Sequence, residues 1–278
     1  MAIRDTAFIR TGDGTRLYVK DWGTGRPVVL IHGWPLDADM WEHQMPALAE
    51  AGYRVVAYDR RGFGRSDQPW TGYDYDTFAD DLKAVLDGLD LQDVALVGFS
   101  MGGGEIARYM SRHAGARVTK AVLVSAVTPY MLKSGDNPDG VDGGVFQGMI
   151  DGLRKDRPAF LANFAKTFFG AGVFHSPVSA ETMTWAGNLA MLASPKATTA
   201  CVTAFGTTDF RGDMTHFRVP TLVIHGDDDQ TVPIDVSGKV AAAAISGATL
   251  VVYEGAPHAV PFTHAERLNA DLLAFLKG

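Results

Sequence analysis

The stretch VALVGFSMGGGE, residues 94–105, decides the fold. Its first six residues are almost all apolar, which is typical of a strand that is buried on both faces. Gly98-Phe99-Ser100-Met101-Gly102 then has the G-x-S-x-G pattern of a sharp strand-to-helix turn, with a small residue two positions on either side of the serine. Such a turn raises the serine hydroxyl above the sheet, at a helix N-terminus that favours negative charge. The stretch predicts that Ser100 is a nucleophile; the alternative is that it only caps the helix.

Short apolar runs alternate with helical patterns on both sides of this turn. Phe78–Leu86 carries apolar residues at helical spacing, and Ala265–Lys277 is expected to form the last helix. This alternation predicts a mostly parallel, doubly wound α/β sheet built from strand–helix–strand units. The other predicted strands are Leu17–Lys20, Pro27–Ile31, Tyr53–Tyr58, Ala121–Val124, Pro220–His225 and Thr249–Tyr253.

The alternation is interrupted between residues 127 and 218. This segment is helical in pattern and rich in aromatic residues and methionine. We interpret residues 127–218 as a helical cap inserted into a single α/β core, which is formed by residues 1–126 and 219–278.

The composition argues against several classes of protein. The 278-residue chain has a net charge of −7 and no stripe of basic residues, so nothing points to nucleic acid as a partner. Cys201 is the only cysteine, which excludes an internal disulfide, and a buried inert thiol fits a reducing cytosol. Residues 1–23 lack the apolar core of a signal peptide, and no run approaches the roughly 18 apolar residues of a membrane span. We expect a cytoplasmic protein without membrane attachment.

A nucleophilic serine needs a base and an acid, which in sheets of this kind follow it in the order acid, then histidine. His258 comes directly after a predicted strand and a four-residue loop, so it is the expected base. Gly226–Asp229 offers three successive carboxylates after another strand, and spacing alone does not choose among them. They lack the alternating spacing of a calcium loop, so we expect no metal. His32 and His225 end other strands and are expected to bond nearby backbone groups.

The chain as a whole resembles the α/β-hydrolases of the cofactor-free haloperoxidase, arylesterase and perhydrolase group. The matching segments are H-G-W-P at 32–35, D-R-R-G-F-G-R-S at 59–66, the turn at Ser100, H-G-D-D-D-Q-T-V-P at 225–233 and G-A-P-H at 255–258. We interpret residues 59–66 structurally, with Arg60 or Arg61 shaping a turn near the site. The resemblance implies the α/β-hydrolase fold with an inserted cap.

The same resemblance assigns roles to individual residues. It implies that the acid is Asp229, three residues after the glycine of H-G-D, with Asp228 as the alternative. Acyl transfer also needs two backbone N–H groups to meet the negative charge that forms on the carbonyl oxygen. Met101, the residue after the serine, is expected to supply one N–H, and the resemblance assigns the other to Trp34.

The expected reaction is serine-dependent hydrolysis of a small hydrophobic carboxylic ester, as in an arylesterase. His258 takes the proton of Ser100, and water attacks the resulting acyl-enzyme without any cofactor. The resemblance adds hydrogen peroxide as a second acyl acceptor, which gives a peracid that oxidises halide, and it implies a homo-oligomer. The alternatives are a lactone, lactam or carbon–carbon bond hydrolase with the same triad and, from another class, a small-ligand receptor with a hydrolase fold.

The expected substrate pocket lies between the cap and the loop at Trp34. Phe164 and Phe168 share one predicted helix face, although both side chains could instead only hold the cap together. Pro35 restricts the backbone of Trp34 and so bears on the direction of the Trp34 carbonyl, an acceptor for attacking peroxide. The alternative is that Pro35 only stiffens this loop.

Overall fold

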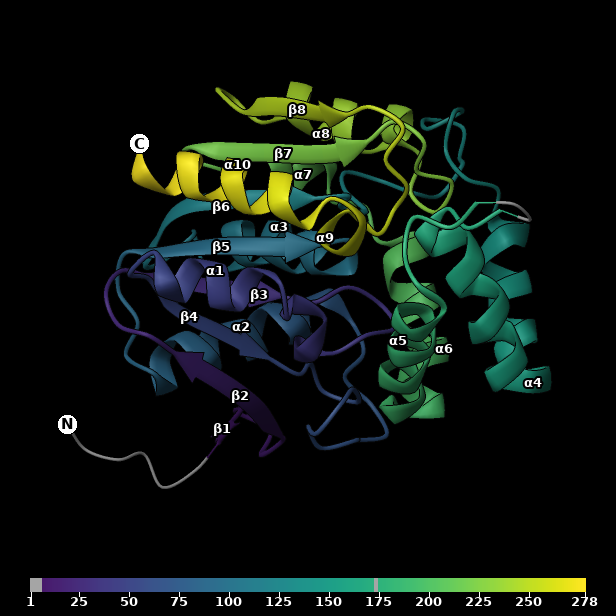
Figure 1. Cartoon of the computed structure of the whole chain (residues 1–278), viewed down its shortest axis with the longest axis horizontal. Coiled ribbons are helices and arrows are strands. Elements are labelled where there is room, and N and C mark those ends of the chain that lie inside the picture. The colour runs from purple at the N-terminus through teal and green to yellow at the C-terminus, as the bar shows by residue number, and fades with distance from the viewer. Residues whose placement is uncertain (1–6, 173–174) are drawn as a thin grey trace.

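The computed structural model describes residues 7–172 and 175–278, so residues 1–6 of the expected core and 173–174 of the expected cap lie outside the described residues. Eight strands form one sheet in the order β1-β2-β4-β3-β5-β6-β7-β8 (Figure 1). β2 pairs antiparallel with β1 and β4, and all other neighbours are parallel. The strands are β1 (Phe8–Arg10), β2 (Arg16–Trp22), β3 (Pro27–Ile31), β4 (Arg54–Tyr58), β5 (Val94–Phe99), β6 (Val118–Val124), β7 (Thr221–Gly226) and β8 (Thr249–Tyr253). The predicted α/β fold class is confirmed.

Helices cover both faces of the sheet, which explains the apolar strands at its centre (Figure 1). α1 (Gln44–Glu50) and α10 (Ala265–Lys277) lie on one face, with the single turn α9 (Val260–Thr263) leading into α10. The other face carries α2 (Tyr75–Gly88), α3 (Met101–Arg112) and α8 (Gly238–Ala244). Two 3₁₀ turns, η1 (Ala38–Trp41) and η2 (Ile234–Val236), complete the loops at the carboxyl edge.

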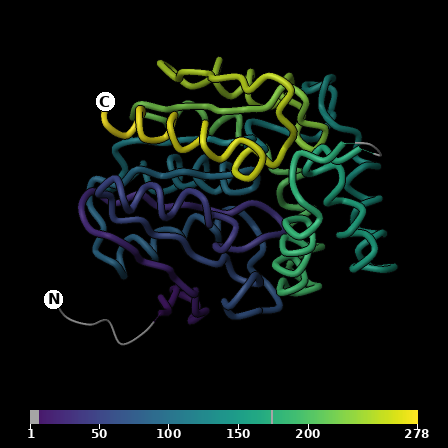
Figure 2. Tube along the Cα trace, viewed as in Figure 1, coloured from purple at the N-terminus to yellow at the C-terminus, as the bar shows by residue number. Residues whose placement is uncertain are grey.

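The described residues between β6 and β7 form four helices, namely α4 (Gly143–Phe169), α5 (Ala180–Leu192), α6 (Pro195–Thr207) and α7 (Arg211–Met214). α4, α5 and α6 lie beyond the carboxyl ends of the parallel strands, as the tube in Figure 2 also shows. α7 instead contacts α3 of the core, and just before it the ring of Phe210 packs edge-on against Tyr75, with centroids 4.6 Å apart. The inserted segment is therefore anchored on the core at its C-terminal end.

The sequence predicted three strands and the last helix to the residue: β3, β5, β8 and α10. It missed β1, which has only three residues. It also did not predict the break in α4, where Asp156 has non-helical angles (φ −158°, ψ 88°) two residues before Pro158. The Asp156 carboxylate accepts a hydrogen bond from Ala159 N (3.0 Å), so the second half of α4 starts as a newly capped helix.

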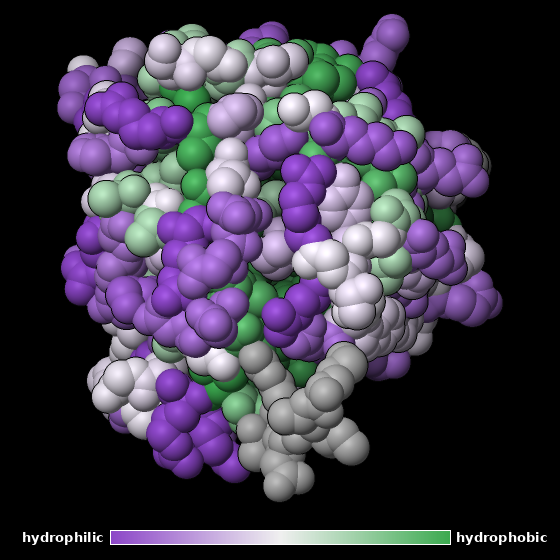
Figure 3. All heavy atoms as spheres, turned by 90° about the vertical axis from the view of Figure 1, so that its left-hand side faces the viewer, coloured by the Kyte–Doolittle hydropathy of each residue, from purple (hydrophilic) through white to green (hydrophobic). Residues whose placement is uncertain are grey.

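The end of the molecule opposite the cap is mostly hydrophilic, with small apolar areas between the charged side chains (Figure 3). Among the described helices, none has the length and apolar character needed to cross a membrane.

Candidate active site

Ser100 lies at the turn between β5 and α3, in a backbone conformation that residues other than glycine rarely adopt (φ 53°, ψ −116°). The flanking glycines make this turn sterically feasible. A Cβ at Gly98 would lie 2.5 Å from the carbonyl oxygen of Gly102, and one at Gly102 would lie 2.4 Å from that of Ile31. The Ser100 carbonyl in turn accepts a hydrogen bond from Gly103 N (3.0 Å). The strained serine is thus held by its surroundings.

The structure brings Ser100, His258 and Asp229 into one chain of hydrogen bonds. Ser100 Oγ lies 2.9 Å from His258 Nε2, and His258 Nδ1 donates to Asp229 Oδ2 at 2.6 Å. The other carboxylate oxygen, Oδ1, accepts from the backbone N–H groups of Thr231 (2.9 Å) and Val232 (2.7 Å). All three side chains of the chain are buried.

The environment of Asp229 keeps its carboxylate charged. Burial alone would raise the pKa of this carboxyl, but the nearby His258 and the hydrogen bonds from both His258 and His225 outweigh it and hold the pKa well below its usual range. A charged carboxylate at Nδ1 fixes the tautomer in which His258 Nε2 is free to accept the Ser100 proton.

Two phenylalanine rings enclose the imidazole of His258. The ring of Phe99 lies 5.0 Å away and that of Phe168 lies 5.3 Å away, centroid to centroid. The Phe168 carbonyl, near the C-terminal end of α4, also accepts a hydrogen bond from Ala259 N (3.0 Å). α4 therefore holds the loop that carries His258.

The other two aspartates of the D-D-D run point elsewhere. Asp227 Oδ1 accepts from Gly255 N (2.6 Å), and Asp228 Oδ1 accepts from the side chain of Gln230 (3.0 Å). Asp228, the alternative acid, is exposed, and its carboxylate is bonded to Gln230 rather than to His258. Within residues 7–172 and 175–278, no group of three or more His, Cys, Asp or Glu side chains is arranged to hold a metal ion.

Sequence reasoning missed a second contact of the acid. His225 was expected to bond nearby backbone, and its Nε2 does lie 2.8 Å from the Val232 carbonyl oxygen. The same nitrogen is also 3.2 Å from Asp229 Oδ2, so His225 and His258 reach the same carboxylate oxygen. The sequence signal that could have predicted this contact is the four-residue spacing between His225 and Asp229, across the turn after β7.

Trp34 and Met101 follow two neighbouring parallel strands, β3 and β5, in which Ile31 is paired with Gly98. The loop at Trp34 lies directly against Ser100, since a Cβ on Gly33 would come within 3.1 Å of the Ser100 Cβ. The Trp34 indole Nε1 donates to the carbonyl of Thr198 on α6 (3.1 Å). The indole thus connects the loop to α6.

A cavity opens in front of Ser100 and His258, with about 470 Å³ of empty space when the part open to solvent is included, and its lining is largely apolar. Trp34 and Phe164 line it, and their rings meet edge-on at 5.1 Å. Pro35 and Phe168 do not: they line a smaller adjacent space of about 280 Å³ on the other side of Phe164. The remaining residues around the larger cavity are Val127, Met131, Val141, Val145, Phe146, Met149, Phe205, Thr231 and Val232.

A serine–histidine–aspartate chain at the carboxyl edge of such a sheet defines a class of protein, and comparison with known proteins gives the same class. Residues 26–265 match the family model described as the alpha/beta hydrolase fold. The chain belongs to the α/β-hydrolase family and is a hydrolase.

Within this family the chain is similar to cofactor-free haloperoxidases. It is 49% identical over 268 residues to a non-heme chloroperoxidase of Kitasatospora aureofaciens (96% of this chain, 98% of the relative). It is 42% identical over 273 residues to a bifunctional esterase/perhydrolase of Acinetobacter calcoaceticus (97% and 99%). The crystal structure of a bromoperoxidase from Bacillus anthracis superimposes with a TM-score of 0.95 at 50% identity, covering 98% of this chain and 99% of the other.

Proposed function

We propose that this chain hydrolyses small hydrophobic carboxylic esters through an acyl-enzyme on Ser100, and that hydrogen peroxide competes with water for the acyl group. The observation that supports this most is the Ser100–His258–Asp229 hydrogen-bond chain at the end of an apolar cavity. The apolar lining favours aryl or short alkyl acyl groups over charged ones.

In the first half of the reaction, Ser100 Oγ attacks the ester carbonyl while His258 Nε2 accepts its proton. The negative charge on the carbonyl oxygen is met by the backbone N–H groups of Trp34 and Met101. When the tetrahedral intermediate collapses, His258 returns the proton to the leaving alcohol. Asp229 stabilises the imidazolium that forms between these two proton transfers.

In the second half, His258 removes a proton from water or hydrogen peroxide, and the resulting nucleophile attacks the acyl-enzyme. As the bond between Ser100 Oγ and the acyl carbon breaks, His258 gives this proton to Ser100 Oγ. Water releases a carboxylic acid, and peroxide releases a peracid. A peracid oxidises bromide or chloride in solution, so a haloperoxidase activity needs no redox centre in the protein. The names of the relatives, chloroperoxidase and esterase/perhydrolase, support the same pair of outcomes.

We further propose a division of the chain and a location, which the sequence pattern and the single cysteine support, and an assembly state, which the family resemblance supports. Residues 127–218 act as a cap on the core formed by residues 1–126 and 219–278. The protein is cytoplasmic, and it assembles into a homo-oligomer.

Turnover of p-nitrophenyl esters of increasing acyl length, with and without peroxide and bromide, tests the proposal. Ser100→Ala is expected to lower kcat by on the order of 10⁶ on every ester and to abolish bromination, because one nucleophile serves both reactions. Loss of ester hydrolysis with bromination retained would show that the peroxide reaction uses another site.

A further inference from the structure

Residues 59–66 have no part in the reaction as proposed, yet they contain two arginines that are almost fully withdrawn from solvent. The side chain of Arg60 is 0% exposed and that of Arg61 is 2% exposed. Burying a guanidinium is unfavourable unless its N–H groups are paired. The partners of each arginine therefore indicate what it holds together.

Arg60 connects α3, the helix that follows Ser100, to the start of the loop that carries Trp34. Its Nε donates to Glu105 Oε2 on α3 (2.8 Å), and its Nη2 donates to the backbone carbonyl of His32 (3.0 Å). Glu105, also fully buried, accepts a second hydrogen bond from the hydroxyl of Tyr58 on β4. One guanidinium thus joins α3, which begins at Met101, to the residue two positions before Trp34.

The backbone of Arg60 fixes the His32 ring as well. Arg60 N–H donates to His32 Nε2 (2.9 Å), so the ring proton is on Nδ1, which faces the Gly33 carbonyl oxygen at 3.0 Å. Burial first, and then the charge of Arg60, hold the pKa of His32 well below its usual range. The ring stays neutral and keeps its acceptor for the Arg60 N–H.

These contacts orient the peptide unit that carries the Trp34 N–H. The Gly33 carbonyl accepts from His32 Nδ1 and also from Leu36 N (3.1 Å). In a planar trans peptide the carbonyl and the following N–H point in opposite directions. With the Gly33 oxygen held by two donors, the Trp34 N–H is directed the other way.

We propose that Arg60, with Glu105, is a positioning residue that fixes the Trp34 N–H relative to the Met101 N–H. This inference rests on the proposed oxyanion roles of those two groups. Arg60 touches no reacting atom; it acts through the His32–Gly33 backbone and through α3. Because an oxyanion forms only during the reaction, losing this alignment lowers kcat and leaves KM nearly unchanged.

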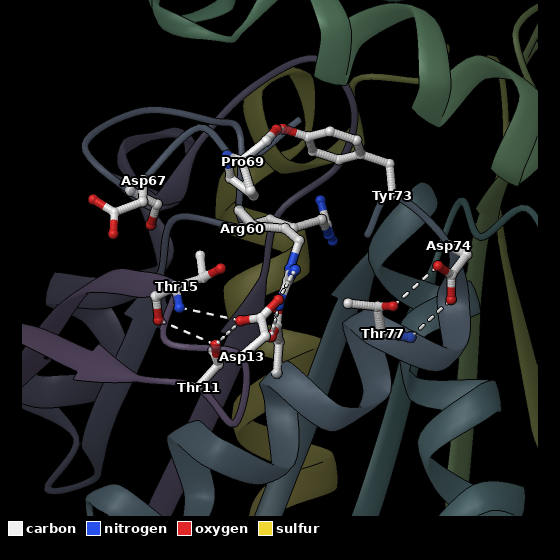
Figure 4. Close-up of polar contacts among 12 residues, drawn as sticks. Thr11, Asp13, Thr15, Arg60, Asp67, Pro69, Tyr73, Asp74 and Thr77 are labelled. Atoms are coloured by element: carbon white, nitrogen blue, oxygen red, sulfur yellow. Dashed lines mark hydrogen bonds and ion pairs between the residues drawn. The ribbon is translucent and has the colours of Figure 1, made fainter. Parts of the chain in front are cut away.

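Arg61 is the matched comparison on the same segment. Its Nε and Nη2 form a two-pronged ion pair with Asp81 on α2 (2.6 Å each), and its Nη1 donates to Asp13 (2.7 Å). Asp13 is held in turn by Thr11 and Thr15 (Figure 4). The Arg61–Asp81 pair is almost as deeply buried as the Arg60–Glu105 pair. The partners of Arg61, however, belong to α2 and to the β1–β2 turn.

The test replaces each charged cluster by apolar residues of similar size, since removing one partner alone leaves a buried charge uncompensated. The first variant is Tyr58→Phe/Arg60→Met/Glu105→Leu, and the control is Arg61→Met/Asp81→Leu. We expect the first variant to lower kcat by about 10- to 100-fold. This is at most the fall in kcat, about 100-fold or more, that follows removal of one whole oxyanion donor. KM should stay within about twofold, and affinity for an aryl boronic acid, which mimics the tetrahedral intermediate, should fall in parallel with kcat.

The control variant should keep kcat and boronic acid affinity near the parental values. If the first variant also keeps both values, or if the control loses kcat equally, the positioning role is wrong. Arg60→Lys serves if the triple variant does not fold, because it retains the charge without the planar fork; a parental kcat there also overturns the role. Ester turnover by Ser100→Ala would instead overturn the proposed function. This variant therefore distinguishes failure of the proposed function from failure of the positioning role.

Discussion

The two sides of the cavity differ in how they are built. One side, the floor, consists of the loops at the carboxyl edge of the sheet that carry Trp34, Ser100, Val232 and His258. The side chains of its serine–histidine–aspartate chain have defined partners, such as the 2.6 Å contact between His258 and Asp229. The other side, the roof, consists of apolar side chains from the segment between β6 and β7, both from helices α4 and α6 and from the loop residues Val127, Met131 and Val141. From this difference we expect the floor to determine the reaction and the roof to determine which acyl groups reach it.

After replacement of Ser100 itself, the largest loss of kcat is expected from replacing the acid on the floor. Asp229→Asn should lower kcat by roughly 10⁴, because the amide favours the wrong His258 tautomer and cannot stabilise the imidazolium. Asp228→Asn is the matched control, since that carboxylate is exposed and bonded to Gln230. Single-turnover rates for the two variants measure the contrast. A large loss in Asp228→Asn alone would place the acid one residue earlier.

The floor is easier to predict from the sequence than the roof. Each floor segment is a contiguous motif of nine residues or fewer directly after a strand, so local patterns predicted Ser100 and His258. The acid needed the family resemblance, because three aspartates share one loop. The sequence could not show that Arg60 reaches His32 and Glu105, which are 28 and 45 positions away along the chain.

The roof depends on contacts between distant helices, and its prediction was less complete. Phe164 and Phe168 do lie one turn apart on α4, with rings 5.8 Å apart. Spacing could not show that Phe164 faces the cavity while Phe168 covers His258. Phe146 and Phe205 also line the cavity but come from α4 and α6, and no sequence periodicity relates the two.

One carboxylate of the floor is expected to make stability depend on pH. The contacts of Asp229 with His258 and His225 outweigh its burial and hold its pKa well below the usual range, so the carboxylate stays charged in mildly acidic solution. A carboxyl with a depressed pKa stabilises the folded state above its ordinary pKa of about 3.9 and loses this contribution as the pH falls further. The difference in Tm between the parent and Asp229→Asn should therefore stay constant from neutral pH down to about pH 4 and shrink below it. A difference that already shrinks near about pH 6 would mean that Asp229 is protonated there.

Two substitutions in the cap separate substrate selection from support of the base. Phe164→Ala enlarges the cavity and should shift the ratio of kcat/KM for long over short acyl esters by about tenfold, the scale of a methylene-sized change in a pocket. Phe168→Ala should lower kcat on all esters alike and lower Tm, because its ring packs on His258 and Phe99. Equal losses on every ester for Phe164→Ala, with a lowered Tm, would mean that Phe164 only holds the cap together.

The smallest expected effect concerns the choice between water and peroxide. Pro35 restricts the backbone of Trp34, and with it the direction of a carbonyl that can accept one hydrogen bond from peroxide. One such bond is worth about 0.5–1.5 kcal/mol, so Pro35→Leu should change the ratio of perhydrolysis to hydrolysis by about threefold to tenfold. Peracid and acid are measured from one ester. An unchanged ratio with lowered stability would make Pro35 a structural residue only.

Covalent labelling tests most directly the claim that Ser100 is the nucleophile activated by His258. A fluorophosphonate should add once to the intact protein, with the adduct mapped to Ser100 by peptide mass spectrometry. His258→Ala should slow the labelling, and Ser100→Ala should abolish it together with ester turnover. An adduct at another residue, or full turnover in an enzyme whose Ser100 is labelled, would contradict the account.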